Sequence, residues 1–187
     1  GRDFSNPVIS HENIPEGVLG HVKGKVILCA DPFLLAANGQ FHMFFEMGNQ
    51  NGAIGHAVSA DGLDWRFDQV VLSCDVHMSY PHVFEHEGEF YMIPETVKAN
   101  EVRLYRARNF PYDWELDTVL LPNQPLADTS IVHWEGRWWL FSYDHRRTGL
   151  CLFHSENLRG PYVPHSSNPV VVGPATARNA GRLIVHE

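Results

Sequence analysis

A motif of sixteen residues occurs three times along this chain, with starts 49 and 48 residues apart. The three copies align without gaps as DPFLLAANGQFHMFFE (31–46), YPHVFEHEGEFYMIPE (80–95) and DTSIVHWEGRWWLFSY (128–143). Each copy has glycine at its ninth position, and in the first copy asparagine precedes it. Asn-Gly between apolar runs is a strong hairpin signal, because this tight turn needs positive φ at both central residues. We therefore predict one two-stranded hairpin in each copy.

A second hairpin signal follows each motif, beginning at Ile54, Val102 and Leu150, again at intervals of 48 residues. The repeating unit is therefore four strands, which matches a propeller blade in strand number and in period. Apolar residues occupy both faces of the second strands, as they do where a sheet is covered on both sides. The sequence predicts an all-β fold of stacked four-stranded blades.

About three and a half blades fit into the 187 residues, which we interpret as one incomplete β-propeller domain covering 1–187. The blades are expected near 31–75, 80–122 and 128–171, with a partial blade from 177. A further strand is predicted at 25–30, either closing the ring or belonging to a preceding blade. The fourth copy stops at Glu187, on the first residue of a turn. Because an open strand edge promotes aggregation, we expect a further segment or a partner chain to complete the propeller.

Charge, hydropathy and cysteine content exclude several classes of function. The formal net charge is −8 and no run of Lys or Arg occurs, so nucleic acid and anionic membranes are poor partners. No apolar stretch is long enough for a membrane span. The three cysteines (Cys29, Cys74 and Cys151) are odd in number and form no CxxC pair, so we expect reduced thiols rather than disulfides or a zinc knuckle.

Acidic residues recur where the first strand of a hairpin starts and the second ends. A two-residue turn fixes the register, which places Asp31 opposite Glu46, Tyr80 opposite Glu95, and Asp128 opposite Tyr143. If the first strands line a central channel, these ends share one rim. Carboxylates that cluster push their pKa values apart, and glycoside hydrolysis needs such an acid and base pair. The candidate catalytic residues are Asp31, Glu95 and Asp128.

The same rim supplies candidate substrate-binding residues, which are Glu46, Tyr80, Asp144, His145, Arg178 and Asn179. An arginine at this place could clamp a carboxylate or phosphate, or could pair with a rim carboxylate. Each acidic residue has a structural alternative, because Asp often caps strand ends or binds loop amides. The sequence leaves both interpretations open.

Metal and cofactor sites have weak support. The chain has 12 histidines, but none shows HxH or HExxH spacing, so no metal site and no cofactor are predicted. A metal ion held across the channel by histidine and water remains an alternative. The tryptophans are expected mainly in the core, although one or two could stack on sugars.

Eight segments together resemble a known family. They are ADPFL (30–34), FHMFFE (41–46), AVSADGLDW (57–65), SYPHVFEHEGEFYMIPE (79–95), VRLYRA (102–107), ADTSIVHWEGRWWLF (127–141), GPYVPHSSNPV (160–170) and ARNAGR (177–182). They resemble the N-terminal propeller domain of plant glucosamine inositolphosphorylceramide transferases and related bacterial proteins. More distantly, the blade-start Asp and the Ser-x-Asp-Gly-x-x-Trp turn resemble glycoside hydrolase family 43 and its five-bladed relatives.

The distant resemblance implies a five-bladed propeller in which Asp31 acts as general base and Asp128 orients the site and tunes pKa values. The acidic residue expected at the start of the fourth blade is absent, because Arg178, Asn179 and Ala180 stand there. This departure speaks against standard hydrolysis and makes Glu95, one blade earlier, the substitute acid.

Three functions therefore compete. The first is a glycoside-hydrolase-like enzyme that cleaves or transfers a glycosidic bond of a carbohydrate or other sugar-containing molecule. The second is a non-catalytic carbohydrate- or phosphosugar-binding accessory domain, because the closer resemblance places transfer in another domain. The third is a scaffold for protein contacts, since propellers host many functions.

Overall fold

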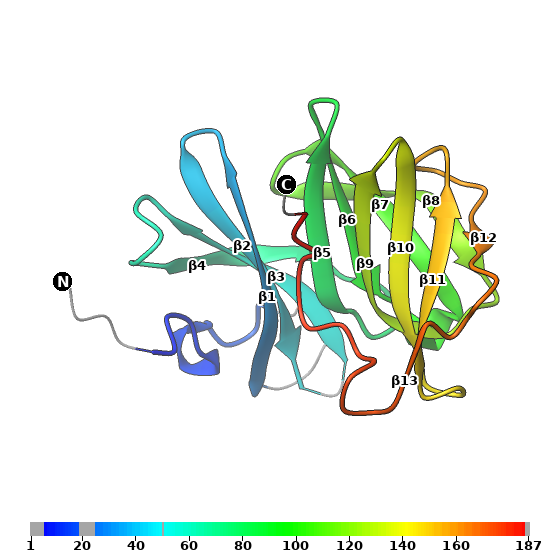
Figure 1. Cartoon of the computed structure of the whole chain (residues 1–187). Helices are drawn as coiled ribbons and strands as arrows, with labels where there is room; N and C mark the ends of the chain where they lie inside the picture. Colours follow the sequence, from blue (N-terminus) through cyan, green and yellow to red (C-terminus); the bar gives the residue numbers. More distant parts are fainter. Residues whose placement is uncertain (1–5, 19–24, 50, 186–187) are drawn as a thin grey trace.

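The chain is built almost wholly from antiparallel β-strands, as Figure 1 shows for a computed structural model that describes residues 6–18, 25–49 and 51–185. The first sheet, here called blade 1, has the order β1-β2-β3-β4. Its strands are β1 (Leu28–Ala37), β2 (Gln40–Gly48), β3 (Gly52–Ser59) and β4 (Arg66–Leu72). A short 3-10 helix, η1 (His11–Asn13), precedes it.

Two further sheets repeat this order along the chain. Blade 2 consists of β5 (Ser79–His86), β6 (Glu89–Glu95), β7 (Glu101–Asn109) and β8 (Asp113–Pro122), with the short helix η2 (Val97–Ala99) between β6 and β7. Blade 3 consists of β9 (Leu126–Trp134), β10 (Arg137–Asp144), β11 (Gly149–Ser155) and β12 (Val163–Pro164), and β13 (Val171–Val172) also pairs with β11. This succession confirms the predicted all-β class.

The first hairpin of each blade turns on a glycine, as predicted. Both central residues have positive φ in all three turns, with values of 51° and 74° for Asn38 and Gly39. The corresponding values are 52° and 79° for Glu87 and Gly88, and 48° and 72° for Glu135 and Gly136. A two-residue hairpin of this type needs positive φ at both central residues. Glycine takes up this conformation without steric cost at the second of them.

Apolar side chains hold the blades together face to face. Blade 1 packs on blade 2 through a buried cluster that includes Phe44, Ile54, Val83 and Met92. Blade 2 packs on blade 3 through a second cluster that includes Ile93 and residues such as Ile131, Trp138 and Leu140. The predicted coverage of both sheet faces therefore comes from stacking of neighbouring blades (Figure 1).

The predicted register is wrong by one residue at the start of each blade. Ala30, and not Asp31, pairs with Glu46; Ser79, and not Tyr80, pairs with Glu95; and Ala127, and not Asp128, pairs with Tyr143. Nearer each turn the register is as predicted. In each blade a bulge separates the start of the first strand from the part nearer the turn. At this bulge, two residues of the first strand oppose one residue of the second.

Two predicted strands also differ from the structure. Residues 28–30 continue into β1 itself and do not form a separate strand, while 25–27 carry no strand. Residues 177–185 carry no strand either, so the fourth copy does not form a blade edge in the part that the structure describes, and Glu187 lies outside that part. Backbone groups of this segment bind side chains of β5 and β9 in place of a neighbouring strand.

Candidate functional site

The three bulges occupy equivalent places in the three blades and begin with Asp31, Tyr80 and Asp128. The φ angles of these residues are 49°, 44° and 49°, so all three lie in the left-handed region. Aspartate tolerates this region, but a bulky residue such as tyrosine enters it rarely, at a cost of about 1–3 kcal/mol. Bulges change the direction in which side chains point. In this chain the bulges occur at Asp31, Tyr80 and Asp128, three of the positions predicted to form the rim.

A central cavity of about 380 Å³ lies at these bulges. Its lining residues are Asp31, Pro32, Phe33, Tyr80, Asp128, Arg178, Asn179, Ala180 and Gly181. Five predicted site residues therefore come together, although they are separated by up to 148 positions (Asp31 to Asn179) in the chain. The size falls within the usual range of small-molecule sites, roughly 300–1,000 Å³.

The Tyr80 hydroxyl ties the C-terminal segment to the inner strands. It lies 3.0 Å from Ser130 Oγ, donates to the Gly181 carbonyl at 3.0 Å, and accepts the Gly181 N–H at 2.8 Å. Ser130 Oγ also donates to the Gly181 carbonyl at 3.1 Å. Buried polar groups with several partners hold a fixed geometry, so this network sets one wall of the central cavity.

Asp128 is the most fully contacted carboxylate of the site. It is only 3% exposed and forms an ion pair with the Arg178 guanidinium. Asn179 Nδ2 donates to the Asp128 carbonyl at 2.7 Å and to the Phe141 carbonyl at 3.0 Å. Residues 178 and 179, which replace the expected acid, therefore act on Asp128 directly.

Glu95 lies behind Asp128 and does not line the central cavity itself. Its Oε2 accepts the Asp128 N–H at 3.4 Å. Burial, a hydrogen bond with the Asp128 carboxylate and the negative charge of Asp128 raise the pKa of Glu95 to about 7. Two adjoining carboxyl groups cannot both ionise easily, so Glu95 keeps its proton to a higher pH than an isolated glutamate does.

Asp31 lines the same cavity as Asp128. Burial and the charge of Asp128 raise its pKa, while Arg178 and the Tyr80 backbone amide act in the opposite direction. The Phe33 ring beside it meets the Tyr80 ring edge-on, with centroids 4.8 Å apart. Asp31 is thus a partly buried carboxylate on an apolar wall.

Glu46 has a partly exposed partner, His77, that the sequence analysis missed. His77 Nε2 lies 3.3 Å from Glu46 Oε1, and His77 Nδ1 accepts the Gly52 N–H at 2.8 Å. The second bond leaves the proton of a neutral imidazole on Nε2, from which it is donated to Glu46. Burial and the charges of Asp31 and Asp128 raise the pKa of Glu46 to about 7.

Asp144 and His145 do not lie among the residues that line the cavity. Asp144 accepts hydrogen bonds from Arg146 at 2.9 and 3.2 Å and pairs with Arg147 at 3.6 Å. Burial acts to raise its pKa, but these arginine contacts outweigh it, and the pKa is lowered. His145 is exposed and meets the Tyr143 ring edge-on. Asp144 is the last residue of β10, and His145 begins the turn that follows.

A search of the described ranges covered clusters of metal ligands and membrane-spanning helices. Within 6–18, 25–49 and 51–185, no group of three or more His, Cys, Asp or Glu is placed to hold a metal ion. No helix in those ranges has the length and apolarity needed to cross a bilayer. The three cysteines are free thiols.

The sequence matches one family model over nearly its whole length. Residues 3–187 match the family described as glucosamine inositolphosphorylceramide transferase 1, N-terminal. Proteins named glucosamine inositolphosphorylceramide transferase 1 from Oryza sativa subsp. japonica and Arabidopsis thaliana are 40% and 38% identical over 98% and 84% of this chain. The chain spans only 25% and 22% of the length of these relatives.

Solved glycoside hydrolases share the fold. A family 117 glycoside hydrolase from the marine bacterium Zobellia galactanivorans matches 91% of this chain and 60% of its own, with a TM-score of 0.65 and 15% identity. An exo-β-1,3-galactanase from Clostridium thermocellum matches 84% of this chain and 38% of its own, with a TM-score of 0.64 and 15% identity. A thermostable family-43 glycoside hydrolase gives a TM-score of 0.61 at 15% identity, over 77% of this chain and 56% of its own. The architecture is thus that of a five-bladed β-propeller, present here in part.

Proposed function

Because this chain belongs to the family of the glucosamine inositolphosphorylceramide transferase 1 N-terminal domain, we propose that its central cavity is a carbohydrate site with carboxylate acid–base chemistry. The relatives are named as transferases of a sugar group, and the fold is that of glycoside hydrolases. Both comparisons favour a sugar-containing substrate. Cleavage or transfer of a glycosidic bond is the reaction class that carboxylates in such a cavity serve.

In this proposal, Asp31 is the general base and Glu95, beside Asp128, is the proton source. Asp31 accepts the proton of the attacking hydroxyl or water. Glu95 supplies the proton for the leaving oxygen, and Asp128, which lines the cavity and pairs with Arg178, orients the site. The observation that carries this assignment is the meeting of Asp31 and Asp128 in one cavity, with Glu95 hydrogen-bonded to Asp128 and its pKa raised to about 7. A carboxyl that holds a proton and a carboxylate that acts as a base are the two roles that glycosidic chemistry separates.

Substitution of Asp31, the proposed base, and of Glu95, the proposed acid, tests the enzymatic function. Asp31→Asn and Glu95→Gln are each expected to lower turnover of a panel of aryl glycosides and oligosaccharides by about 10²–10⁴-fold, as removal of a general acid or base does. The Glu85→Gln change, at an exposed carboxylate on β5, serves as the control and should leave turnover unchanged. Unchanged rates in both site variants would remove the acid–base assignment.

A second candidate function rests on Arg178. This residue stands where an acidic residue is expected, and 52% of its side chain is exposed while it pairs with Asp128. An exposed guanidinium at a cavity suits a sugar phosphate. A non-catalytic phosphosugar-binding module would show saturable heat with sugar phosphates in calorimetry, lost with salt and in Arg178→Ala, and no turnover. Turnover that survives Arg178→Ala would reject this candidate.

A further inference from the structure

His77 stands at a position where the repeat does not require a histidine. It lies three residues before the bulge at Tyr80, and the residues at the same place before the other two bulges are Leu28 and Pro125. Neither of these side chains forms hydrogen bonds, so the fold of a blade does not depend on an imidazole here. The polar contacts of His77 therefore need an explanation other than blade architecture.

Gly52 is the residue that holds the imidazole of His77 in place. Its N–H donates to His77 Nδ1 at 2.8 Å, and its carbonyl accepts the N–H of Met78 at 3.1 Å. A Cβ atom at Gly52 would lie 2.8 Å from His77 Cε1 and 2.3 Å from the Met78 carbonyl oxygen. These distances are too short for a side chain, so only glycine at this position accommodates His77.

The hydrogen bond from Gly52 keeps this imidazole neutral. A ring nitrogen that accepts a hydrogen bond carries no proton, so protonation of His77 would set two N–H groups against each other. Burial and the positive charge of Lys98, on η2, lower the pKa of His77 and favour the same neutral form. The remaining N–H, at Nε2, faces Glu46 Oε1 at 3.3 Å.

Glu46 holds the place in blade 1 that Glu95 holds in blade 2, 49 residues later. The neighbour of Glu95 is Asp128, the bulge residue of the next blade. For Glu46 the corresponding bulge residue is Tyr80, whose hydroxyl is engaged by Gly181. The two equivalent glutamates thus differ in their surroundings, and His77 gives Glu46 a hydrogen-bond donor.

We infer that His77 is a positioning residue of the central site, whose neutral imidazole fixes the Glu46 carboxyl and favours its charged form. Glu46 is 7% exposed and does not line the cavity, so it acts through its electrostatic interaction with Asp31 and Asp128. A charged Glu46 favours the positive, oxocarbenium-like transition state of glycosidic chemistry. This role rests on the proposed function, in which Asp31 is the base.

Two variants separate the two hydrogen bonds of His77. In His77→Asn the amide oxygen can still accept from Gly52, but the short side chain leaves Glu46 without a donor, whereas the longer side chain of His77→Gln can still donate to Glu46. The titration of Glu46 is followed by the NMR shift of its carboxyl carbon, which is identified by its loss in Glu46→Gln. The midpoint, about 7 in the wild type, should rise by about 1 pH unit in His77→Asn and return towards the wild-type value in His77→Gln. His133→Asn, at an exposed position on β9, is the control and should leave the midpoint unchanged.

An unchanged midpoint in a folded His77→Asn variant would overturn the inference. So would a proton on His77 Nδ1 in the nitrogen NMR spectrum of the wild type, a measurement that decides the question without any variant. Turnover of the glycoside panel is measured on the same proteins, and kcat should fall several-fold in His77→Asn, with little change in KM, and recover in His77→Gln. If the wild type turns over no glycoside while Glu46 titrates as described, the enzymatic proposal fails and the assignment of His77 stands.

Discussion

Replacing Glu95 by glutamine removes the titration of one carboxyl without changing its shape, so its effect on stability is set by the pKa. Burial and the neighbouring Asp128 raise the pKa of Glu95 from 4.5 to about 7 in the folded chain. Between these values the folded state holds a proton that the unfolded state has lost. The free energy of unfolding of the wild type therefore falls as pH rises from about 4.5 to 7 through this group.

The full shift corresponds to at most about 3 kcal/mol, and solvent screening of this partly exposed carboxyl leaves ~1–2 kcal/mol. Glutamine avoids this loss, so Glu95→Gln should match the wild type near pH 4.5 and exceed it at pH 8. For a chain of this length, that gain equals a rise in melting temperature of about 3–6 °C.

Urea denaturation followed by tryptophan fluorescence at both pH values measures this difference directly, with Glu85→Gln as the control for loss of one exposed charge. An equal difference at pH 4.5 and pH 8 would show that Glu95 does not hold a proton in the folded chain. A variant less stable than the wild type at pH 8 would refute the reasoning about the Glu95–Asp128 pair.

Three other substitutions are expected to lower stability, each through a contact or a backbone conformation that the structure shows. Tyr80→Phe leaves the Gly181 N–H and carbonyl without this partner, so the 178–181 segment should loosen by about 1–3 kcal/mol; faster exchange of the Gly181 amide checks this, and unchanged exchange contradicts it. Gly136→Ala places a side chain at φ 72° with no neighbour within 4 Å, so strain alone should cost ~1–2 kcal/mol in urea denaturation; no loss would disprove the turn geometry. His56→Leu leaves His42 Nδ1 without its partner at 3.0 Å and should destabilise by about 1–3 kcal/mol, whereas a more stable variant would show that the buried bond contributes nothing.

The hairpins and blade stacking could be predicted from the sequence because they depend on local signals that recur. A glycine-tipped turn and alternating apolar residues specify a hairpin wherever they occur. The bulges could not be predicted in this way, because each adds one residue to the first strand of its blade while the turn stays the same. Pro32 and Pro81 were available as signals, because proline lacks the N–H that a ladder needs. Blade 3 has Thr129 at that place and gives no such warning.

The central cavity was predicted in part. The repeat placed Asp31, Tyr80 and Asp128 at equivalent positions, and the structure brings them together with Arg178 and Asn179. His77 was missed because it lies in a connection outside the repeated motif, where no periodicity marks its contact with Glu46.

Asp144 ends β10 and pairs with Arg146 and Arg147 of the turn that follows, and it does not line the cavity. Pairing of this kind depends on the path of the turn, which residue spacing does not specify.

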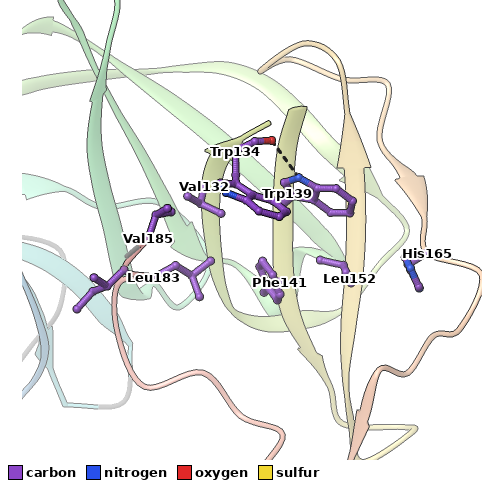
Figure 2. A pocket seen from close by; sticks show the side chains of 9 residues that line it. Val132, Trp134, Trp139, Phe141, Leu152, His165, Leu183 and Val185 are labelled. Atoms are coloured by element: carbon purple, nitrogen blue, oxygen red, sulfur yellow. Dashed lines mark hydrogen bonds between the residues drawn. The ribbon is translucent and has the colours of Figure 1, made fainter. Parts of the chain in front are cut away.

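A crystal structure of this chain soaked with monosaccharides tests the central claim most directly. The account predicts electron density for a sugar ring within hydrogen-bond distance of Asp31 and Asp128, beside Arg178. A ring stacked on Trp139 of blade 3 (Figure 2), with nothing between Asp31 and Asp128, would contradict it.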